Sequence, residues 1–251
     1  EWSLDDPQEE GDPPGLELLR AITPFGGPLH LEIDVTDVAN GLPGEHRLRA
    51  HITTWSDGAG QVSGSNGGWN VSAHFDMVPG TPPHDVAMVK SLYYKSHGAA
   101  DAPGPLSFTA PDDAVSGRVE YRVTGHGGGD GGSNCIGPAE EFCRRFHTIT
   151  FDDVEIYGFE PWRTDCSDYC TITHYGPAAR GFDYCAENPT GAIQSVNAPR
   201  ANWCPGAVTE PVLLTIPEMG IPGDHSFGWA VDEIAEGGSW VVSATYVAYR
   251  N

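Results

Sequence analysis

Apolar and polar residues alternate along three short stretches in the first third of this chain, at residues 29–35, 47–52 and 69–77. Successive side chains of a β-strand point to opposite faces, so each stretch predicts a strand with one buried face and one wet face. The chain also contains 32 glycines and 21 prolines, a composition that argues against a helical protein. The pattern therefore predicts an all-β fold.

A second block of strands is predicted beyond the segment Val78–Pro83, whose prolines and glycine interrupt strand pairing. Short strands separated by long loops are typical of an antiparallel sandwich or jelly roll. The expected strands of this block are residues 86–94, 117–124, 147–157, 208–216, 227–231 and 240–249. We expect two domains: a partial one at 1–84, of which the acidic, proline-rich residues 1–16 are loop or linker, and a second at 85–251.

The charge and hydropathy of the chain exclude two classes of protein. The net charge is −22 and only two lysines are present, which excludes a nucleic-acid binder that needs clustered cations. No apolar run reaches the ~20 residues of a membrane span. These features predict a secreted or cell-surface protein, or a periplasmic one.

The chain contains six cysteines: Cys135, Cys143, Cys166, Cys170, Cys185 and Cys204. An even set at local spacings predicts disulfides and an oxidising compartment, although the sequence alone leaves the pairing open. A zinc site is disfavoured, because no Cys-x-x-Cys pair is present and the histidines are scattered.

The most distinctive local feature is a glycine-rich loop after Thr124. It leads into a turn that holds Glu140 and Glu141 between Cys135 and Cys143. Glycines allow close approach of the backbone to a ligand, and a disulfide could fix the direction of a carboxylate. The alternative is a disulfide-closed surface loop with incidental acids.

Seven segments, in order along residues 18–210, resemble the peptide-N-glycosidase F family. They are Arg20–Phe25 (Arg-Ala-Ile-Thr-Pro-Phe), Leu31–Asp37 (Leu-Glu-Ile-Asp-Val-Thr-Asp), Thr54-Trp55, Phe75–Pro82, the Gly125-His126 loop, Glu141–Cys143 with His147–Ile149, and Arg200–Gly206 (Arg-Ala-Asn-Trp-Cys-Pro-Gly). The resemblance implies two antiparallel jelly-roll sandwich domains packed side by side, the first truncated here. It also implies the disulfides Cys135–Cys143 and Cys185–Cys204, which leaves Cys166 with Cys170.

The family hydrolyses the amide that joins asparagine to N-acetylglucosamine in N-glycans, which needs a carboxylate for proton transfer and polar groups around the reacting amide. The resemblance makes Glu141 the acid, Arg200 a clamp for that acid or for the amide oxygen, and Trp55 a stacking surface for the sugar. His126 stands where the family has a tryptophan, among glycines that would leave it room to move.

Two family acids are replaced in this chain. Ser3 stands at the position of the central acid, so Asp5 or Asp6 would have to supply it, and Thr53 stands at the position of the second. The resemblance therefore predicts a secreted glycoamidase with a rearranged site that acts on an N-glycan or glycopeptide. The alternative is a non-catalytic jelly-roll protein that binds glycan or assembles into a surface structure. Under either function we expect an upstream fragment or further copies of the chain to complete the first domain, whose open sheet edge invites a partner.

No cofactor is expected. If a metal were bound, calcium would be favoured, with Asp130, Asp165 and Asp168 as oxygen ligands in turns. Copper is disfavoured, because strand alternation places His74 and Met77 on opposite faces.

Overall fold

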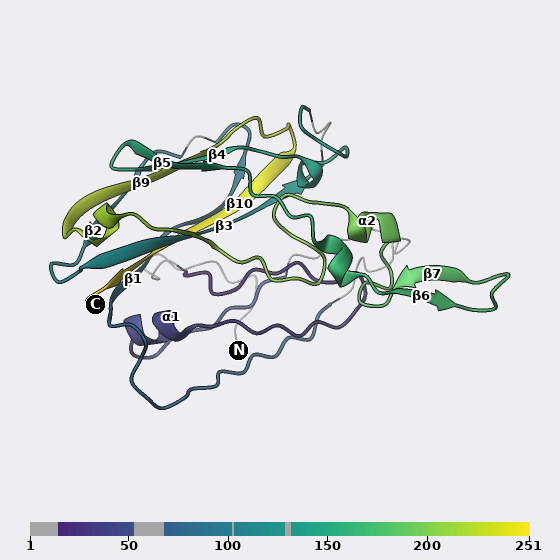
Figure 1. The fold of residues 1–251 in the computed structure, drawn as a ribbon, viewed down its shortest axis with the longest axis horizontal. Coiled ribbons are helices and arrows are strands. Elements are labelled where there is room, and N and C mark those ends of the chain that lie inside the picture. Colours follow the sequence, from purple (N-terminus) through teal and green to yellow (C-terminus); the bar gives the residue numbers. More distant parts are fainter. Residues whose placement is uncertain (1–14, 53–67, 102, 129–131) are drawn as a thin grey trace.

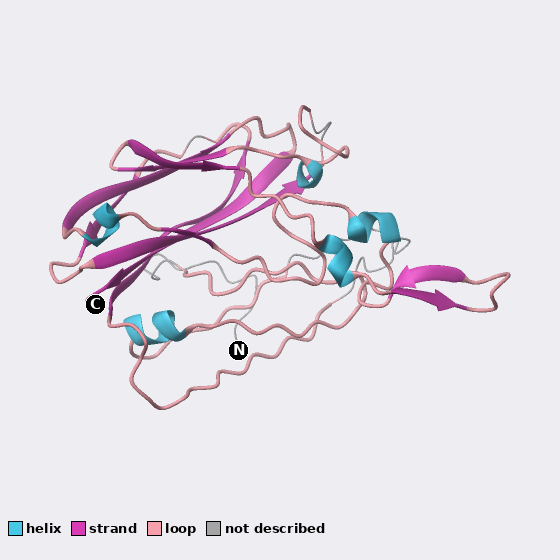
Figure 2. Cartoon of the chain, in the orientation of Figure 1, coloured by secondary structure: helices cyan, strands magenta, loops and turns pink. Residues whose placement is uncertain are grey.

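A computed structural model describes residues 15–52, 68–101, 103–128 and 132–251 (Figure 1). In these residues two four-stranded antiparallel sheets face each other and form a sandwich, as Figure 2 shows, and a separate two-stranded hairpin projects from it. The first sheet has the strand order β1-β10-β3-β8 and the second has the order β2-β9-β4-β5. The strands are β1 (Val86–Gly98), β2 (Leu106–Ala110), β3 (Ser116–Gly127), β4 (His147–Phe151), β5 (Val154–Phe159), β6 (Ile172–Tyr175), β7 (Phe182–Cys185), β8 (Val212–Leu214), β9 (Gly223–Val231) and β10 (Gly238–Tyr249). The helices are short: α1 (Thr36–Gly41), α2 (Ile193–Asn197), and the 3-10 turns η1 (Glu140–Phe142), η2 (Cys166–Tyr169) and η3 (Pro217–Gly220).

The core lies between the two sheets and follows the period-two pattern of the strands. Alternate residues of β3 and β10 point inward and meet the inner faces of β2, β4 and β9. The large buried side chains of this core include Tyr121, Trp240, Tyr246, Phe227 and Ile149. The predicted all-β, antiparallel jelly-roll class is therefore confirmed.

The predicted strands of the second block are formed, with local differences. The stretch 147–157 is divided into β4 and β5 by a turn in which Asp152 and Asp153 have positive φ. The stretch 208–216 contains only the short β8. The sequence analysis did not predict β2, although its residues Leu-Ser-Phe-Thr-Ala alternate, and it did not predict the hairpin of β6 and β7.

The strands predicted in the first block are not formed. In the described residues between 15 and 84, the only regular element is α1, and the stretches 29–35 and 69–77 pair with no strand. Val71, Phe75 and Met77 are 57%, 53% and 71% exposed. Alternation gives a strand only where a neighbouring strand completes the ladder, and none lies beside these residues in the described chain. The domain boundary at residues 84 and 85 stays a prediction.

The segment from Leu16 to Leu42 covers the outer face of the first sheet. Glu17 accepts two hydrogen bonds from the guanidinium of Arg20, and Arg20 also donates to the main-chain oxygen of Val241 on β10 at 2.7 Å. Leu16, Val38 and Leu42 pack on Val247 and its neighbours. This cover explains why both faces of β10 are buried.

All six cysteines form disulfides, but only one of the three predicted pairs is correct. Cys135–Cys143 is confirmed. The pairs Cys166–Cys170 and Cys185–Cys204 are wrong, since the structure joins Cys166 to Cys204 and Cys170 to Cys185. Cys166 begins η2 and is buried beside Cys204, whereas Cys170 follows the end of η2 at the base of the hairpin, so the two cysteines meet different partners. Three disulfides fit an oxidising compartment. No helix in the described ranges is long and apolar enough to cross a membrane.

The core contains a histidine that should make the fold sensitive to acid. Burial, and to a smaller extent the nearby His97, lowers the pKa of His147 to about 3. An unfolded histidine has a pKa of about 6.5, so its neutral form stabilises the fold fully above pH ~6.5 and this contribution is lost as the pH falls from ~6.5 toward ~3. One proton taken up on unfolding lowers the free energy of unfolding by about 1.4 kcal/mol for each pH unit of acidification in that window.

Urea unfolding between pH ~7.5 and ~5 should therefore show a stability slope that His147→Gln reduces by an amount that grows as the pH falls and approaches one proton near pH ~5. Glutamine retains an acceptor for the Tyr121 hydroxyl, which lies 3.0 Å from His147 Nδ1. An unchanged slope in the variant would show that His147 does not titrate on unfolding.

Candidate functional site

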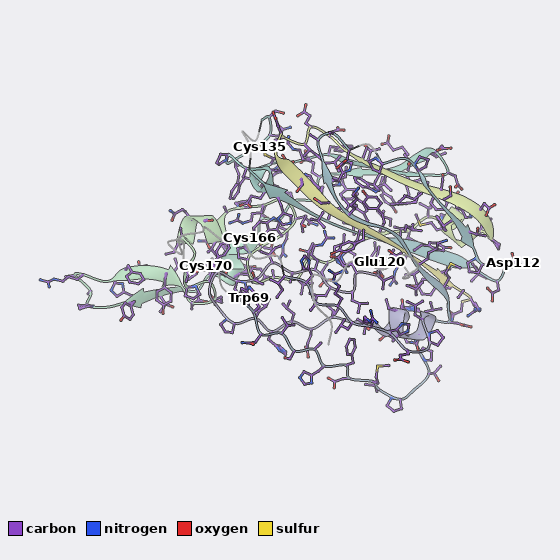
Figure 3. All side chains as sticks on the ribbon, turned by 180° about the vertical axis from the view of Figure 1, so that it is seen from behind. Trp69, Asp112, Glu120, Cys135, Cys166 and Cys170 are labelled. Atoms are coloured by element: carbon purple, nitrogen blue, oxygen red, sulfur yellow. A yellow bond between two sulfur atoms is a disulfide. The ribbon has the colours of Figure 1, made fainter. Side chains whose placement is uncertain are left out.

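Glu140 and Glu141 occupy consecutive positions of η1, in the loop closed by Cys135–Cys143 at the end of β3. Figure 3 places Cys135 at the edge of the sandwich from which β3 leads into this loop. The tight turn directs the two side chains apart: Glu140 is fully buried, whereas the side chain of Glu141 is 27% exposed. The neighbouring carboxylates therefore have different environments.

Glu140 is held by four donors. Arg145 donates to it from Nε at 2.7 Å and from Nη2 at 2.8 Å. The indole N–H of Trp240 donates at 2.9 Å and the backbone N–H of Ala235 at 3.0 Å. Its oxygens are thus saturated by donors from the segment between η1 and β4, from β10 and from the loop before β10, and we assign it a structural role.

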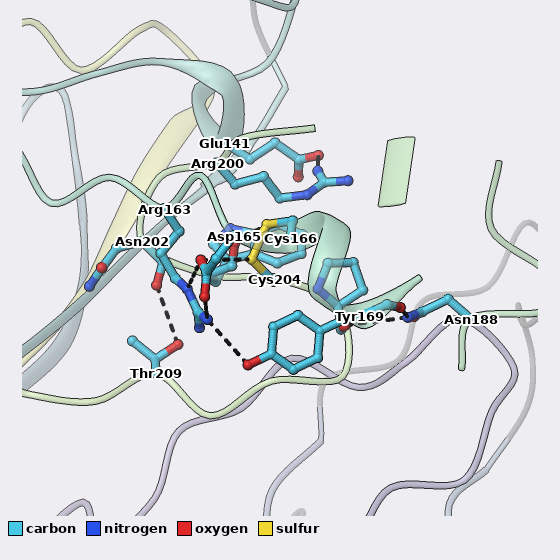
Figure 4. Close-up of a disulfide and its surroundings, with 12 residues drawn as sticks. Glu141, Arg163, Asp165, Cys166, Tyr169, Asn188, Arg200, Asn202, Cys204 and Thr209 are labelled. Carbon is cyan, nitrogen blue, oxygen red and sulfur yellow. Dashed lines mark hydrogen bonds and ion pairs between the residues drawn. A yellow bond between two sulfur atoms is a disulfide. The ribbon is translucent and has the colours of Figure 1, made fainter. Parts of the chain in front are cut away.

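Glu141 pairs with Arg200. Its Oε1 accepts from Arg200 Nη1 at 2.7 Å, as Figure 4 shows. Burial raises the pKa of Glu141 above its ordinary value, and the charge and hydrogen bond of Arg200 offset only part of that shift. The pair thus presents a partly exposed carboxyl group, suited to proton transfer, beside a cation.

Arg200 is itself buried, and aromatic rings flank it. Its guanidinium carbon lies 4.7 Å from the ring centre of Phe142 and 4.5 Å from that of Trp203. Its Nη2 donates to the main-chain oxygen of Ser195 and, at 3.1 Å, to the Ser195 hydroxyl. Its Nε is buried and has no hydrogen-bond partner within the described structure. The rings fix the orientation of the guanidinium that faces Glu141.

His126 joins this group through Trp203. The two rings stack with centres 5.5 Å apart, and His126 Nε2 lies 2.8 Å from the hydroxyl of Thr124. Burial, with a smaller contribution from the charge of Arg20, lowers the pKa of His126 to about 4, so it is neutral near pH 7. The expectation that His126 has room to move is wrong, because stacking and a hydrogen bond hold it.

Backbone contacts bring these residues together. The N–H of Gly125 donates to the oxygen of Ala201 at 3.0 Å, and the N–H of Ala201 donates to the oxygen of Glu141 at 2.8 Å. A Cβ on Gly125 would lie 2.6 Å from the Cβ of Ala201. Glycine at this position is therefore required for the segment at 200–203 to lie between β3 and η1.

A hollow of about 560 Å³ adjoins this group and is lined by residues that include Arg163, Tyr169 and Asn202. Arg163 forms a backbone bridge with Arg200, with N···O distances of 2.9 and 3.0 Å, and Figure 4 shows Arg163 and Tyr169 beside the Cys166–Cys204 disulfide. The backbone bridge between Arg163 and Arg200 thus connects the hollow with the Glu141–Arg200 pair.

Three of the predicted site residues, Glu141, Arg200 and His126, form one group in the structure. Asp5, Asp6, Thr53 and Trp55 lie outside the described residues. Sequence reasoning missed Trp203, which links the other members. It lies inside the quoted segment Arg200–Gly206, so an aromatic residue three positions after the arginine was an available signal.

No group of three potential metal ligands lies together in the described part of the chain. Of the residues considered for calcium, Asp165 is instead bound to Arg163, whose Nε donates at 2.9 Å. Asp130 lies outside the described residues.

The chain is similar in sequence to a known protein family and to one characterised relative. Residues 93–247 match the family model described as "Peptide-N-glycosidase F, C terminal". The chain is 28% identical over 207 residues to the peptide-N(4)-(N-acetyl-β-D-glucosaminyl)asparagine amidase F of Elizabethkingia miricola, and the match covers 76% of this chain and 50% of that protein. It thus spans about half the length of the curated relative it matches.

Solved structures share the fold. PNGF-II matches at 24% identity with a TM-score of 0.50, covering 65% of this chain and 30% of PNGF-II. PNGase F, a glycosylasparaginase from Flavobacterium meningosepticum, matches at 16% identity with a TM-score of 0.51, covering 69% of this chain and 55% of PNGase F. At these identities the structural likeness shows the fold alone.

Proposed function

This chain belongs to the peptide-N-glycosidase F family, whose model matches residues 93–247, and we propose that it takes part in the hydrolysis of N-glycan linkages. The reaction would cleave the amide between an asparagine side chain and N-acetylglucosamine. Water supplies the new oxygen of an aspartate, the C–N bond breaks, and the nitrogen leaves with the sugar as a glycosylamine. The curated relative is named for an asparagine amidase of this kind.

The observation that carries the proposal is the Glu141–Arg200 pair. A carboxyl group whose pKa is raised by burial can exchange a proton with the departing nitrogen. The guanidinium 2.7 Å away orients that carboxyl group and favours the negative charge that develops on the amide oxygen. Neither group is tied into the sandwich core as Glu140 is.

Other roles follow as parts of the same proposal. Asp5 or Asp6 would provide the second carboxylate that activates water, while Trp55 and Thr53 would contact the sugar. His126, neutral and stacked on Trp203, would keep the indole in place beside Arg200. The three disulfides support a secreted location, where glycoproteins are met.

Incubation of the wild-type chain with a denatured N-glycoprotein tests this function. The proposal predicts release of intact glycans, detected as a fall in the mass of the glycoprotein. If the chain binds the glycoprotein but releases nothing, the non-catalytic glycan-binding function replaces the enzymatic one.

A partner strand is a further part of the proposal, supported by the exposed apolar positions of residues 69–77. Trp69 is 38% exposed, and Val71, Phe75 and Met77 are more than half exposed. Exposed, alternating apolar side chains are typical of a surface that another strand covers. A further copy of the chain, or a segment of a longer protein, would supply it.

We expect light scattering of this chain to show concentration-dependent association, which the pair Val71→Lys and Phe75→Lys reduces. The matched control is Val154→Lys and Ile172→Lys, at positions that are 63% and 60% exposed outside this segment. A monomer at all concentrations would contradict a further copy of the chain as the partner.

A further inference from the structure

The hairpin of β6 and β7 extends away from the sandwich, as Figures 1 and 2 show. Within the described residues its two strands pair only with each other, and each is four residues long. An isolated two-stranded hairpin is only marginally stable in water. This hairpin nevertheless carries several aromatic residues on its surface. Such exposure indicates a surface with a binding role.

The register of the hairpin separates its side chains into two unlike faces. Tyr175 pairs with Phe182 and Thr173 pairs with Tyr184, so these four residues share one face. The ring centres of Tyr175 and Phe182 lie 5.5 Å apart, and those of Phe182 and Tyr184 lie 6.1 Å apart. We call Tyr175, Phe182 and Tyr184 the aromatic face.

Two of the three rings of the aromatic face are open to solvent, and Tyr184 is half-buried. Tyr175 is 65% exposed and Phe182 is 60% exposed. The opposite face instead carries the hydrogen-bonded pair of His174 and Asp183, 2.7 Å apart. The aromatic rings are therefore concentrated on one side of the hairpin.

Two disulfides connect the hairpin to the Glu141–Arg200 site. Cys185, the last residue of β7, is bonded to Cys170, and Cys166 at the start of η2 is bonded to Cys204. Cys204 directly follows Trp203, which packs on Arg200. Figure 3 shows Cys166 and Cys170 where the hairpin leaves the body of the protein. The crosslinks fix the base of the hairpin to the site.

We propose that the aromatic face is a stacking platform for the pyranose rings of the glycan whose linkage the Glu141–Arg200 site holds. This inference rests on the proposed function for the identity of the ligand. A pyranose ring has an apolar C–H face and hydroxyl groups at its rim. Exposed aromatic rings match the former, and the hydroxyls of Tyr175, Tyr184 and Thr173 can hydrogen-bond to the latter.

The negative charge of the chain favours an uncharged glycan over anionic ligands. The chain has a net charge of −22, which disfavours anionic membranes and nucleic acids. The aromatic face itself contains no ionisable carboxylate or cation, so it suits an uncharged ligand. A row of rings on a rigid base also suits an extended chain of sugars better than a single small molecule.

The test uses the whole chain and a free oligomannose N-glycan as probe, with binding followed by calorimetry. The double variant Tyr175→Ala and Phe182→Ala should lose about tenfold or more in affinity, since each stacked ring contributes a few-fold. The matched control is Ile172→Ala, which removes a 60% exposed apolar side chain from the opposite face and should bind like the wild type. Circular dichroism verifies that the variants fold.

Each outcome decides the inference. Unchanged affinity in the folded double variant, or no binding by the wild type, overturns it. Loss of self-association or of binding to neutral phosphatidylcholine vesicles in the double variant, with glycan affinity intact, also overturns it. Glycan binding that depends on the hairpin, without any glycan release, supports the aromatic face while the hydrolase function fails.

Discussion

Glu140→Gln is expected to lower the free energy of unfolding by about 3–5 kcal/mol, the cost of breaking a buried ion pair from one side. The carboxylate is fully buried and accepts from Arg145 twice and from Trp240 and Ala235 once each. Glutamine preserves the shape but removes the charge that compensates Arg145, and its amide N–H groups would face donors. The loss is measured by urea denaturation at neutral pH.

Glu160→Gln is the matched control for this experiment. Glu160 forms a 3.5 Å ion pair with Arg144, and the two side chains are 41% and 48% exposed. A surface pair of this kind contributes within about 1 kcal/mol, so the control should unfold nearly like the wild type. A Glu140→Gln variant as stable as the control would contradict the structural role of Glu140.

Glu141→Gln should lower the rate of glycan release by about a hundredfold or more, the usual cost of losing a general acid or base. Glutamine retains a hydrogen bond to Arg200 but cannot exchange a proton. The loss should appear in kcat more than in KM, because the contact with Arg200 that positions the side chain remains.

A measurement of stability distinguishes a loss of catalysis in this variant from a loss of folding. From the sequence, an exposed loop carboxylate would add little stability, but the structure pairs Glu141 with a buried guanidinium. We therefore expect Glu141→Gln to destabilise the fold by less than Glu140→Gln and to stay folded at assay temperature. Normal turnover by Glu141→Gln would remove this residue from the mechanism.

The two neighbouring glutamates show what sequence could and could not predict at the site. The resemblance identified Glu141 and Arg200, and the structure joins them at 2.7 Å. The role of Glu140 was out of reach, because its partners Trp240 and Ala235 lie about a hundred residues away and meet it only through the sandwich. Long-range contacts of this kind leave no local pattern.

The same reasoning applies to the fold. The expected strands at 117–124 and 240–249 are formed as β3 and β10, whose apolar faces meet a second sheet. The clean alternation at 69–77 gave no strand, since a strand also needs a neighbour. The cysteine pairing failed for a related reason: the resemblance implied Cys185 with Cys204 and left Cys166 with Cys170, whereas the fold brings Cys166 to the distant Cys204.

Hydrolysis in water enriched in ¹⁸O tests the central claim most directly. A defined N-glycopeptide is incubated with the wild-type chain, and the peptide product is analysed by mass spectrometry. The account predicts an aspartate at the former glycosylated asparagine, with one ¹⁸O atom in its side-chain carboxyl group. A peptide that keeps its asparagine, whether still glycosylated or trimmed to a single N-acetylglucosamine, would contradict it.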